Sequence, residues 1–223
     1  LVVLMVVTTT VAFALARGEI VDLGTLGGEE SMANGINASG QIVGASATES
    51  SSSHAFLWEK GEMRDLGTLG GELSVAHAIN ARGQVVGMSL LTESGELTSR
   101  AFLWQNGTMT ALPTLGGAKT EAMAISDSGL IVGWSETDSG ALHAVLWDKG
   151  EIADLGTLGG EESLARGVNA RGQVVGGAET ASSEGHAFLW EKGTMTDLGT
   201  LGGENSEASA INARGQVVGW SEF

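Results

Sequence analysis

The sequence of 223 residues contains no cysteine, no tyrosine and a single proline, and its basic residues are few. Without cysteine there is no disulfide and no thiol nucleophile. Cysteine usage therefore gives no information on the cellular compartment of the protein. The 11 Lys and Arg residues stand against 27 Asp and Glu residues, which gives a net charge of -16. Affinity for nucleic acid depends largely on basic side chains that neutralise phosphates, so this balance excludes DNA and RNA as partners.

Glycine is abundant in the sequence, whereas proline is scarce. The chain has 35 glycines, so its many turns are glycine turns. Apolar residues make up 42% of the sequence. That share is enough for a hydrophobic core, and it excludes a disordered chain despite the glycine content.

A unit of about 43 residues is repeated along the chain, and a period of this size indicates a repeat architecture. Three sequence blocks define the unit. The block DLGTLGG begins at Asp22, Asp65, Asp154 and Asp197, with the variant ALPTLGG at Ala111. Blocks of the type INARGQVVG begin at Ile36, Ile79, Ile125, Val168 and Ile211. Blocks of the type HAFLWEKG begin at His54, Arg100, His143 and His186.

Each unit contains four short segments typical of β-strands, because they are rich in β-branched or aromatic residues and are bounded by glycine. Examples are residues 84–87, 55–58, 63–66 and 75–79. The Ala-Phe-Leu-Trp segment is apolar at every position, so both faces of its sheet must be buried, as they are in a propeller blade. We therefore predict an all-β fold, a β-propeller of five four-stranded blades built from repeats of about 43 residues. The Gln-Val-Val-Gly strand is expected to be innermost.

Two turns of the repeat carry conformational predictions. The Asn-Ala-Arg-Gly turn, as at residues 80–83, suits a short hairpin with glycine at a positive φ. Pro113 stands where the other units have the first glycine of DLGT. Proline has a negative φ and no N–H, so we expect that position to need neither a positive φ nor a backbone donor.

These blocks resemble the HAF repeat family of predicted extracellular bacterial proteins, named for the His-Ala-Phe found at residues 54–56 and 186–188. The resemblance covers the chain from about residue 17 to residue 221. It implies an exported, propeller-like protein, and it implies no reaction and no catalytic residue. The strand order also looks like that of a kelch blade.

Residues 1–16 have two interpretations. They carry no charge and end in Ala-Leu-Ala, which is typical of an apolar leader with a small-x-small cleavage site and predicts export. They are too short and too interrupted by threonine for a stable membrane span. Alternatively, residues 11–15 align with His-Ala-Phe-Leu-Trp and close the ring together with residues 216–220. Residues 1–10 are then surplus apolar chain that can pair with an exposed edge. The two interpretations conflict, because cleavage after Ala16 would remove the closing strand. Residues 17–223 are predicted to form a single propeller domain.

Candidate ligand-binding residues occupy two positions of the repeat. Trp134 and Trp220 each follow Val-Gly at the end of a strand, where an aromatic ring can stack on a sugar. An acidic residue follows Gly-Gly in four units, and a ring of such carboxylates can hold a hard cation. No Asp-x-Asp-x-Asp spacing supports a cation site, so we predict no metal and no cofactor. The acidic candidates are Glu29, Glu72, Glu161 and Glu204.

Other conspicuous residues are interpreted as structural. Three histidines share one repeat position at a strand start, where a side-chain hydrogen bond is expected rather than a metal. The aspartates that open DLGTLGG are expected to accept backbone N–H groups in their turns. Tryptophans of the Ala-Phe-Leu-Trp strands are expected to pack between blades. The three histidines are His54, His143 and His186, the fourth histidine of the chain is His77, and the tryptophans are Trp58, Trp104, Trp147 and Trp190.

No catalytic pattern is present: the sequence has no Gly-x-Ser-x-Gly elbow, no His-Glu-x-x-His and no phosphate loop. The least repetitive segments are residues 45–53, 88–99, 134–142 and 177–185. In a propeller they share one face with the Gly-Gly-Glu loops, and variable loops on a rigid scaffold commonly bind ligands.

We therefore predict a non-catalytic extracellular or cell-surface binding module that takes a glycan or a protein on its loop face. One alternative is a self-associating structural protein that uses the apolar N-terminal strand. Another is a five-bladed carbohydrate-active hydrolase with a carboxyl pair on different blades. Near-identical repeats argue against the hydrolase, since an active site needs unlike residues in unlike roles.

Overall fold

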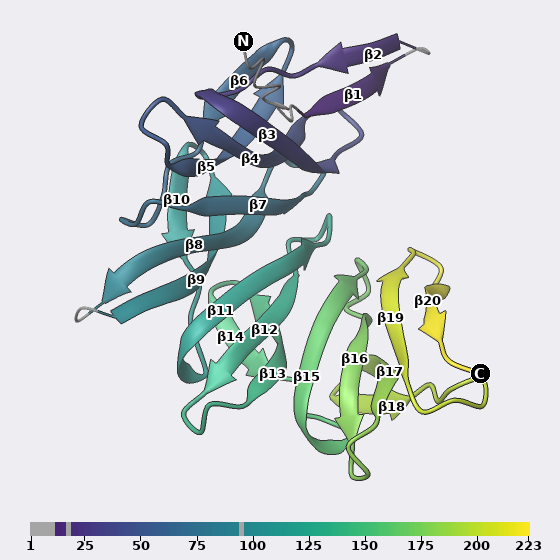
Figure 1. The fold of residues 1–223 in the computed structure, drawn as a ribbon. Coiled ribbons are helices and arrows are strands. Elements are labelled where there is room, and N and C mark those ends of the chain that lie inside the picture. The colour runs from purple at the N-terminus through teal and green to yellow at the C-terminus, as the bar shows by residue number, and fades with distance from the viewer. Residues whose placement is uncertain (1–11, 17–18, 94–95) are drawn as a thin grey trace, which may run out of the picture.

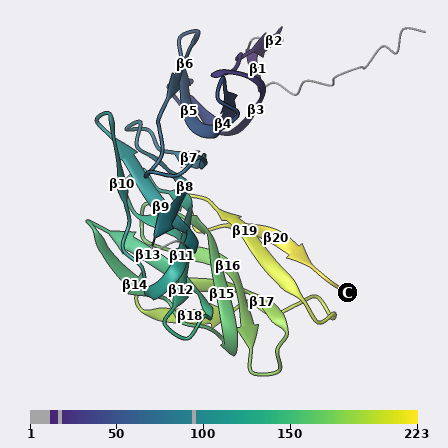
Figure 2. The same cartoon turned by 60° about the vertical axis from the view of Figure 1, so that its left-hand side comes forward.

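The structure, a computed structural model, describes residues 12–16, 19–93 and 96–223. These residues form twenty β-strands, and none of them belongs to a helix. The all-β prediction is therefore confirmed for the described part of the chain. Figures 1 and 2 show the strands grouped into small sheets that follow one another in a curved row. The described residues accordingly contain no helix long and apolar enough to cross a membrane.

Four consecutive units each form an antiparallel set of four strands in chain order. The first unit comprises β3 (Gly27–Ile36), β4 (Ile42–Thr48), β5 (Ser53–Glu59) and β6 (Glu62–Asp65), and the second β7 (Ser74–Ile79), β8 (Val85–Glu93), β9 (Glu96–Gln105) and β10 (Thr108–Ala111). The third comprises β11 (Gly116–Ile125), β12 (Ile131–Thr137), β13 (Leu142–Asp148) and β14 (Glu151–Asp154), and the fourth β15 (Gly159–Val168), β16 (Val174–Thr180), β17 (Gly185–Glu191) and β18 (Thr194–Asp197). One parallel bridge between Lys119 and Ser99 joins the second and third units into an eight-stranded sheet.

The strand that begins each unit differs from our prediction. The Gln-Val-Val-Gly strand, predicted to be innermost, is the second strand of its sheet. The strand before it lies at one side of each four-stranded set, and β3, β7, β11 and β15 contact one another in succession along the row. A periodic sequence fixes the length of the repeat but not the point at which each sheet begins, and this explains the error.

Each end of the chain contributes a two-stranded hairpin. The N-terminal hairpin consists of β1 (Phe13–Ala16) and β2 (Glu19–Asp22), and the C-terminal hairpin of β19 (Ser206–Ile211) and β20 (Val217–Ser221). Phe13 lies opposite Asp22 as Phe56 lies opposite Asp65, so β1 and β2 correspond to the third and fourth strands of a unit. The C-terminal hairpin corresponds to the first and second.

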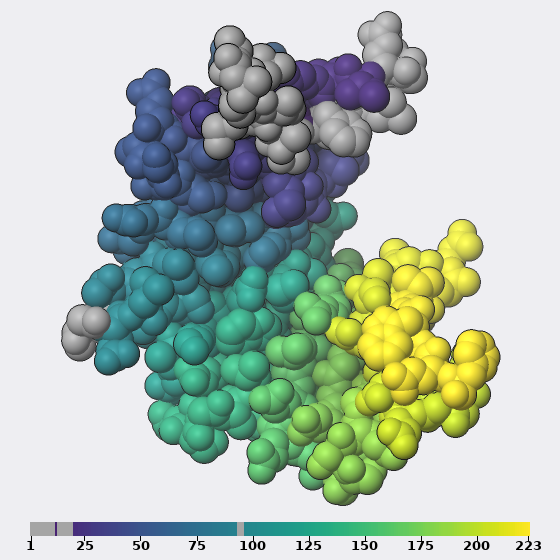
Figure 3. Space-filling view, viewed as in Figure 1, coloured from purple at the N-terminus to yellow at the C-terminus, as the bar shows by residue number. Residues whose placement is uncertain are grey.

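Closing the predicted five-blade ring requires β20 to lie beside β1. Among the described residues these strands belong to two separate two-stranded sheets, and the purple N-terminal and yellow C-terminal segments lie at separate places on the surface (Figure 3). Ring closure and the number of five blades therefore stay predictions. The proposed roles of residues 1–10 lie outside the described residues.

The hydrophobic core lies between consecutive units rather than inside one sheet. Val43 of β4, for example, packs in one cluster with Val85 and Phe102 of the second unit. Phe56 and Trp147 of the Ala-Phe-Leu-Trp strands are fully buried. Burial on both sheet faces, which the uniformly apolar strands predicted, is confirmed.

A buried hydroxyl on each first strand links that strand to the preceding unit. Ser74 Oγ accepts the Ala55 N–H at 2.8 Å and donates to the Gly67 carbonyl at 2.6 Å. Thr120 holds the same place in the third unit and accepts the Ala101 N–H at 2.7 Å. We call these residues the hydroxyl clamps. They are Ser31, Ser74, Thr120, Ser163 and Ser206.

Asparagine side chains connect the units at the turns after the first strands. Asn37 Oδ1 accepts the N–H groups of Ser39 and Gln41, and its Nδ2 donates to the Asn80 carbonyl of the next unit at 3.0 Å. Asn169 donates in the same way to Asn212 at 3.1 Å. The predicted glycine conformation of these turns is confirmed, with φ of 79° at Gly40.

The prediction drawn from Pro113 is wrong for the other units. The equivalent Gly67 has a φ of 75°, and its N–H donates to Asp65 Oδ1 at 2.7 Å. At the end of the second unit Ala111 replaces the aspartate, and Pro113 replaces the glycine that follows, so the side-chain acceptor and the backbone donor are lost together. The Pro113 carbonyl instead accepts the Trp147 Nε1–H at 2.9 Å.

Candidate functional site

The four predicted acidic candidates are exposed, and each lies in its own unit near the start of the first strand. They are Glu29, Glu72, Glu161 and Glu204. Within residues 12–16, 19–93 and 96–223 no group of His, Asp or Glu side chains could hold a metal ion. The acidic candidates are thus four separate solvated carboxylates.

The loop face has the composition we predicted. Residues 51–53, at the end of the β4–β5 turn and the start of β5, border the Gly70–Glu72 segment of the next unit around a hollow of about 660 Å³. Leu97, at the tip of the β8–β9 hairpin, lines the same hollow and is 66% exposed. A hollow of about 480 Å³ repeats this arrangement at Glu161 and His143. The variable loops and the Gly-Gly-Glu segments therefore share one face.

Trp134 and Trp220 each belong to a cluster of three unlike side chains. Trp220 lies opposite Glu207 on the neighbouring strand, and its Nε1–H donates to Glu207 Oε2 at 3.4 Å. Arg166 of the fourth unit donates from Nε to Glu207 Oε1 at 2.6 Å. We call Arg166, Glu207 and Trp220 the Trp220 cluster.

The Trp134 cluster has the same plan two units earlier. Trp134 lies opposite Glu121, and His77 Nε2 of the second unit is 2.7 Å from Glu121 Oε1. In both clusters a first-strand base of one unit pairs with a first-strand acid of the next unit. The row of near-identical units thus contains these two clusters, in each of which an aromatic ring, a carboxylate and a base lie together.

The two tryptophans were predicted from the sequence, but their partners were not. The signal was available in two repeat positions. The residue after each hydroxyl clamp is Met32, Val75, Glu121, Leu164 or Glu207, and the residue after Val-Gly is Ala45, Met88, Trp134, Gly177 or Trp220. Glutamate and tryptophan appear only in the third and fifth members of both series, so they occur together.

The Trp220 cluster lines a hollow of about 230 Å³ between the fourth unit and the C-terminal hairpin. Trp220 is 51% exposed, whereas the side chains of Arg166 and Glu207 are 36% and 24% exposed. Gly177 forms part of the wall, and a Cβ there would meet Glu207 Cγ at 3.3 Å. Met88 holds the place of Gly177 beside the Trp134 cluster. Of the two clusters, the Trp220 cluster is therefore the one with room for a ligand.

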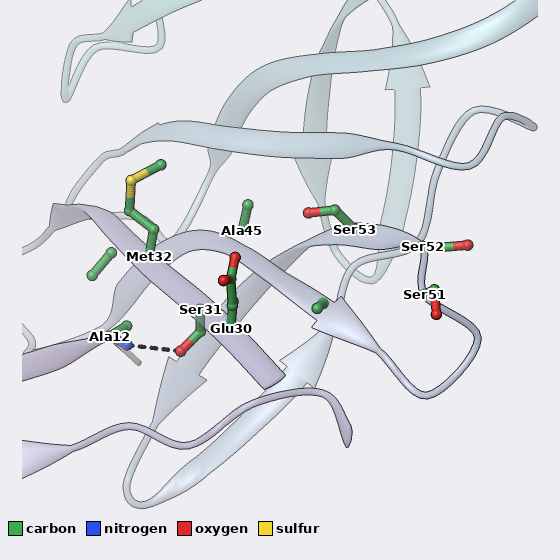
Figure 4. Close-up of a pocket in the computed structure, with 10 residues that line it drawn as sticks. Ala12, Glu30, Ser31, Met32, Ala45, Ser51, Ser52 and Ser53 are labelled. Atoms are coloured by element: carbon green, nitrogen blue, oxygen red, sulfur yellow. Dashed lines mark hydrogen bonds between the residues drawn. The ribbon is translucent and has the colours of Figure 1, made fainter. Parts of the chain in front are cut away.

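A larger hollow of about 650 Å³ lies on the first unit beside the N-terminal hairpin (Figure 4). Alanine and serine side chains form most of its wall, with Glu30 and Met32. Ser31 is engaged as a hydroxyl clamp, accepting the Ala12 N–H at 2.7 Å. The described residues of its wall include no aromatic ring and no ion pair, so they offer fewer directional contacts to a ligand than the Trp220 cluster does.

Three histidines hold structural positions, as predicted. His54, His143 and His186 place Nδ1 within 2.8 to 2.9 Å of an aspartate carboxylate of their own unit. The same aspartates accept a glycine N–H two residues further on, for example Gly199 N–H to Asp197 Oδ1 at 2.7 Å. The prediction that these aspartates accept backbone N–H groups in their turns is confirmed.

The pKa of Asp197 lies below its ordinary value. Burial by itself raises the pKa of Asp197, but the hydrogen bonds from His186 and the Gly199 N–H, with the His186 charge, lower it by more. A carboxylate with a depressed folded-state pKa stabilises the fold above its unfolded pKa of about 4. This contribution is lost as the pH falls through the folded-state value.

Asp197→Asn is therefore expected to flatten the loss of stability on acidification below about pH 4. Urea unfolding midpoints of the wild type and the variant, measured from pH 6 downward, check this difference. Asp148 is exposed and does not open a DLGTLGG turn, so Asp148→Asn is the control. It should keep the wild-type dependence of the unfolding midpoint on pH. Equal slopes for Asp197→Asn and the wild type would show that the carboxylate contributes nothing.

The tryptophans of the third strands pack as predicted. Trp147 is 1% exposed and Trp104 is 7% exposed. Trp58 and Trp190 are partly buried against the interface clusters. The Arg64 guanidinium also lies 5.2 Å from the centre of the Trp104 ring, which connects the first and second units.

No protein-family model matches the chain, and no curated protein matches it. Among solved structures, TolB from Acinetobacter baumannii matches 80% of this chain with a TM-score of 0.54 and 13% sequence identity. TolB is a propeller protein. The fold of this chain is therefore propeller-like. The match covers 45% of the TolB chain, so the present chain spans less than half the length of that protein. At this identity the likeness concerns the fold alone.

Proposed function

We propose that the chain is a non-catalytic, exported binding module of the β-propeller type, and that it holds a neutral glycan at the Trp220 cluster. The observation that carries the proposal is the hollow at Arg166, Glu207 and Trp220 within an otherwise repetitive scaffold. Membership of the HAF repeat family and export belong to the same proposal. The sequence blocks and the apolar residues 1–16 support them.

The chemistry of the cluster suits a sugar. An indole ring that is 51% exposed offers an apolar face for the C–H face of a pyranose, and the Glu207 carboxylate accepts hydroxyl protons. The Arg166 contact fixes the carboxylate before any ligand arrives, which reduces the entropy lost on binding. A net charge of -16 opposes polyanionic glycans, so the expected ligands are neutral.

A binding role also fits the carboxylates better than hydrolysis does. Glycosidases need two carboxyl groups in different environments on either side of the bond they cleave. At the Trp220 cluster, Glu207 is already engaged by Arg166 and by the Trp220 N–H, and Glu179 accepts the Glu161 N–H. We therefore expect the module to bind a saccharide and release it unchanged.

Titration with neutral oligosaccharides, followed by tryptophan fluorescence, tests this proposal. Trp220→Ala is expected to weaken binding about tenfold, because stacking contributes roughly 1.4 kcal/mol. Glu207→Gln should weaken it less, since the amide still accepts a hydrogen bond. Phe223→Ala removes an aromatic ring that is 94% exposed and does not line the hollow, and it serves as the control.

Two results would contradict the proposal. Unchanged affinity in Trp220→Ala would place the ligand elsewhere, and no binding across the panel would rule out neutral glycans. Release of new reducing ends from a bound oligosaccharide would instead favour the hydrolase alternative. A second function, self-association, has its own observation in the two terminal hairpins and is developed below.

A further inference from the structure

The four interfaces between consecutive units share one apolar contact set. In each, a valine of the second strand packs with an alanine and a β-branched residue from the first strand of the next unit. Val43 packs with Ala76 and Ile79, Val86 with Ala122 and Ile125, Val132 with Ala165 and Val168, and Val175 with Ala208 and Ile211. All four valines are 0% exposed.

The two ends of the row carry the separate halves of a fifth set. Val218 of β20 has the repeat position of the four valines but is 64% exposed. Ala33 and Ile36 of β3 have the positions of the partner residues, and Ile36 is 65% exposed. Ala33 also lines the 650 Å³ hollow of the first unit. Each end therefore leaves exposed an apolar surface that every internal interface buries.

We propose that the Val218 end of one copy docks on the Ala33 and Ile36 end of a second copy. The strand β20 of the first copy then lies beside β1 of the second, with Gly219 opposite Phe13 as Gly44 lies opposite Phe56. The Asn212 amide reaches the Asn37 carbonyl as Asn37 reaches Asn80. The contact is head-to-tail, so it produces open chains or a closed pair of copies.

A second copy, rather than the same chain, is the partner that leaves every existing interface intact. The N-terminal hairpin is fixed on the first unit by the Ser31 clamp and by packing of Ala12 and Leu23 with Ile42. The C-terminal hairpin is fixed on the fourth unit by the Ser206 clamp. Figure 3 shows the purple and yellow ends apart on the surface. Joining them within one chain would require the clamped interfaces between them to shift, whereas docking between copies requires no shift.

The natural absence of cysteine allows a direct test with the full chain. Ile36→Cys and Val218→Cys are made as two separate single variants and mixed under oxidising conditions. A disulfide between these two cysteines can only join two copies. The expected result is a major non-reduced product of twice the chain mass, together with an unmodified chain whose mass in solution rises with concentration.

Two further variants serve as controls. Val175→Cys with Ile211→Cys in one chain reproduces the contact at an internal interface and should cross-link, which shows that the geometry permits a disulfide. Leu97→Cys mixed with Val218→Cys pairs two equally exposed sites that should not meet, and it gives the background.

The outcomes separate the competing arrangements, and none of them depends on glycan binding. If the mixture cross-links no more than the Leu97 background while an Ile36→Cys, Val218→Cys double variant cross-links at the mass of one chain, the chain closes on itself and docking between copies is wrong. If neither preparation cross-links and the unmodified chain stays monomeric at every concentration, both end surfaces are unused and the proposal also fails. Val218→Glu should abolish the concentration dependence without altering the thermal unfolding of the monomer.

Discussion

Gly176→Ala is expected to destabilise the protein by about 3 kcal/mol or more, because the new methyl group has no space. A Cβ at Gly176 would lie 1.9 Å from the Leu164 carbonyl oxygen and 3.0 Å from the Ala165 Cα. These are backbone atoms of the paired strand β15, where the register shifts between Ala165 and Gly167. Relief of the clash therefore requires β15 and β16 to separate.

The neighbouring residue provides a matched control for this prediction. A Cβ at Gly177 would meet the flexible Glu207 side chain at 3.3 Å, and the first unit has Ala45 at the same repeat position. Gly177→Ala is thus expected to change stability by no more than about 0.5 kcal/mol. Urea unfolding of both variants, with midpoints and slopes compared, checks the contrast. Equal losses would show that the close approach at Gly176 does not determine the choice of glycine.

Ser163→Ala is expected to cost about 2 kcal/mol, because it leaves a buried backbone group without a partner. Ser163 is 2% exposed, accepts the Ala144 N–H at 2.8 Å and donates to the Gly156 carbonyl at 2.6 Å. The Ala144 N–H belongs to the third unit, so the substitution weakens an interface between units. We expect a lower unfolding midpoint and faster amide exchange at Ala144.

The third unit supplies the control for the hydroxyl clamp. Thr120 has the place of Ser163, is fully buried and accepts the Ala101 N–H at 2.7 Å. Ser163→Thr keeps the hydroxyl and should retain most of the stability that Ser163→Ala loses. If Thr and Ala destabilise equally, steric fit at this site matters more than the hydrogen bond.

The strands and the repeat were predictable because both depend on local patterns. The uniformly apolar Ala-Phe-Leu-Trp segments indicated burial on both sheet faces, and Phe56 and Trp147 confirm it. The first strand of each sheet was not predictable from the period, because a periodic sequence is compatible with any starting point. Which strand begins each sheet is determined by contacts between units, such as the hydrogen bond from the Ala55 N–H to Ser74 Oγ.

The candidate site was predicted in part for the same reason. Trp220 was selected from its position after Val-Gly, but its partners Glu207 and Arg166 lie on different units and meet only in the folded row. The four acidic candidates lie apart because a shared repeat position places residues one unit apart and does not bring them together. Unlike residues at different repeat positions are the ones that converge.

The hydroxyl clamps and interface clusters connect each unit to its immediate neighbours. Stability in such a row is the sum of nearest-neighbour terms, and opening spreads inward from units that have one neighbour instead of two. Among the described residues of a single copy, the C-terminal hairpin is one of these, and the Trp220 hollow spans its boundary with the fourth unit. A ligand bound there contacts both sides of the boundary that opens first. Its binding free energy therefore opposes the separation of the C-terminal hairpin from the fourth unit.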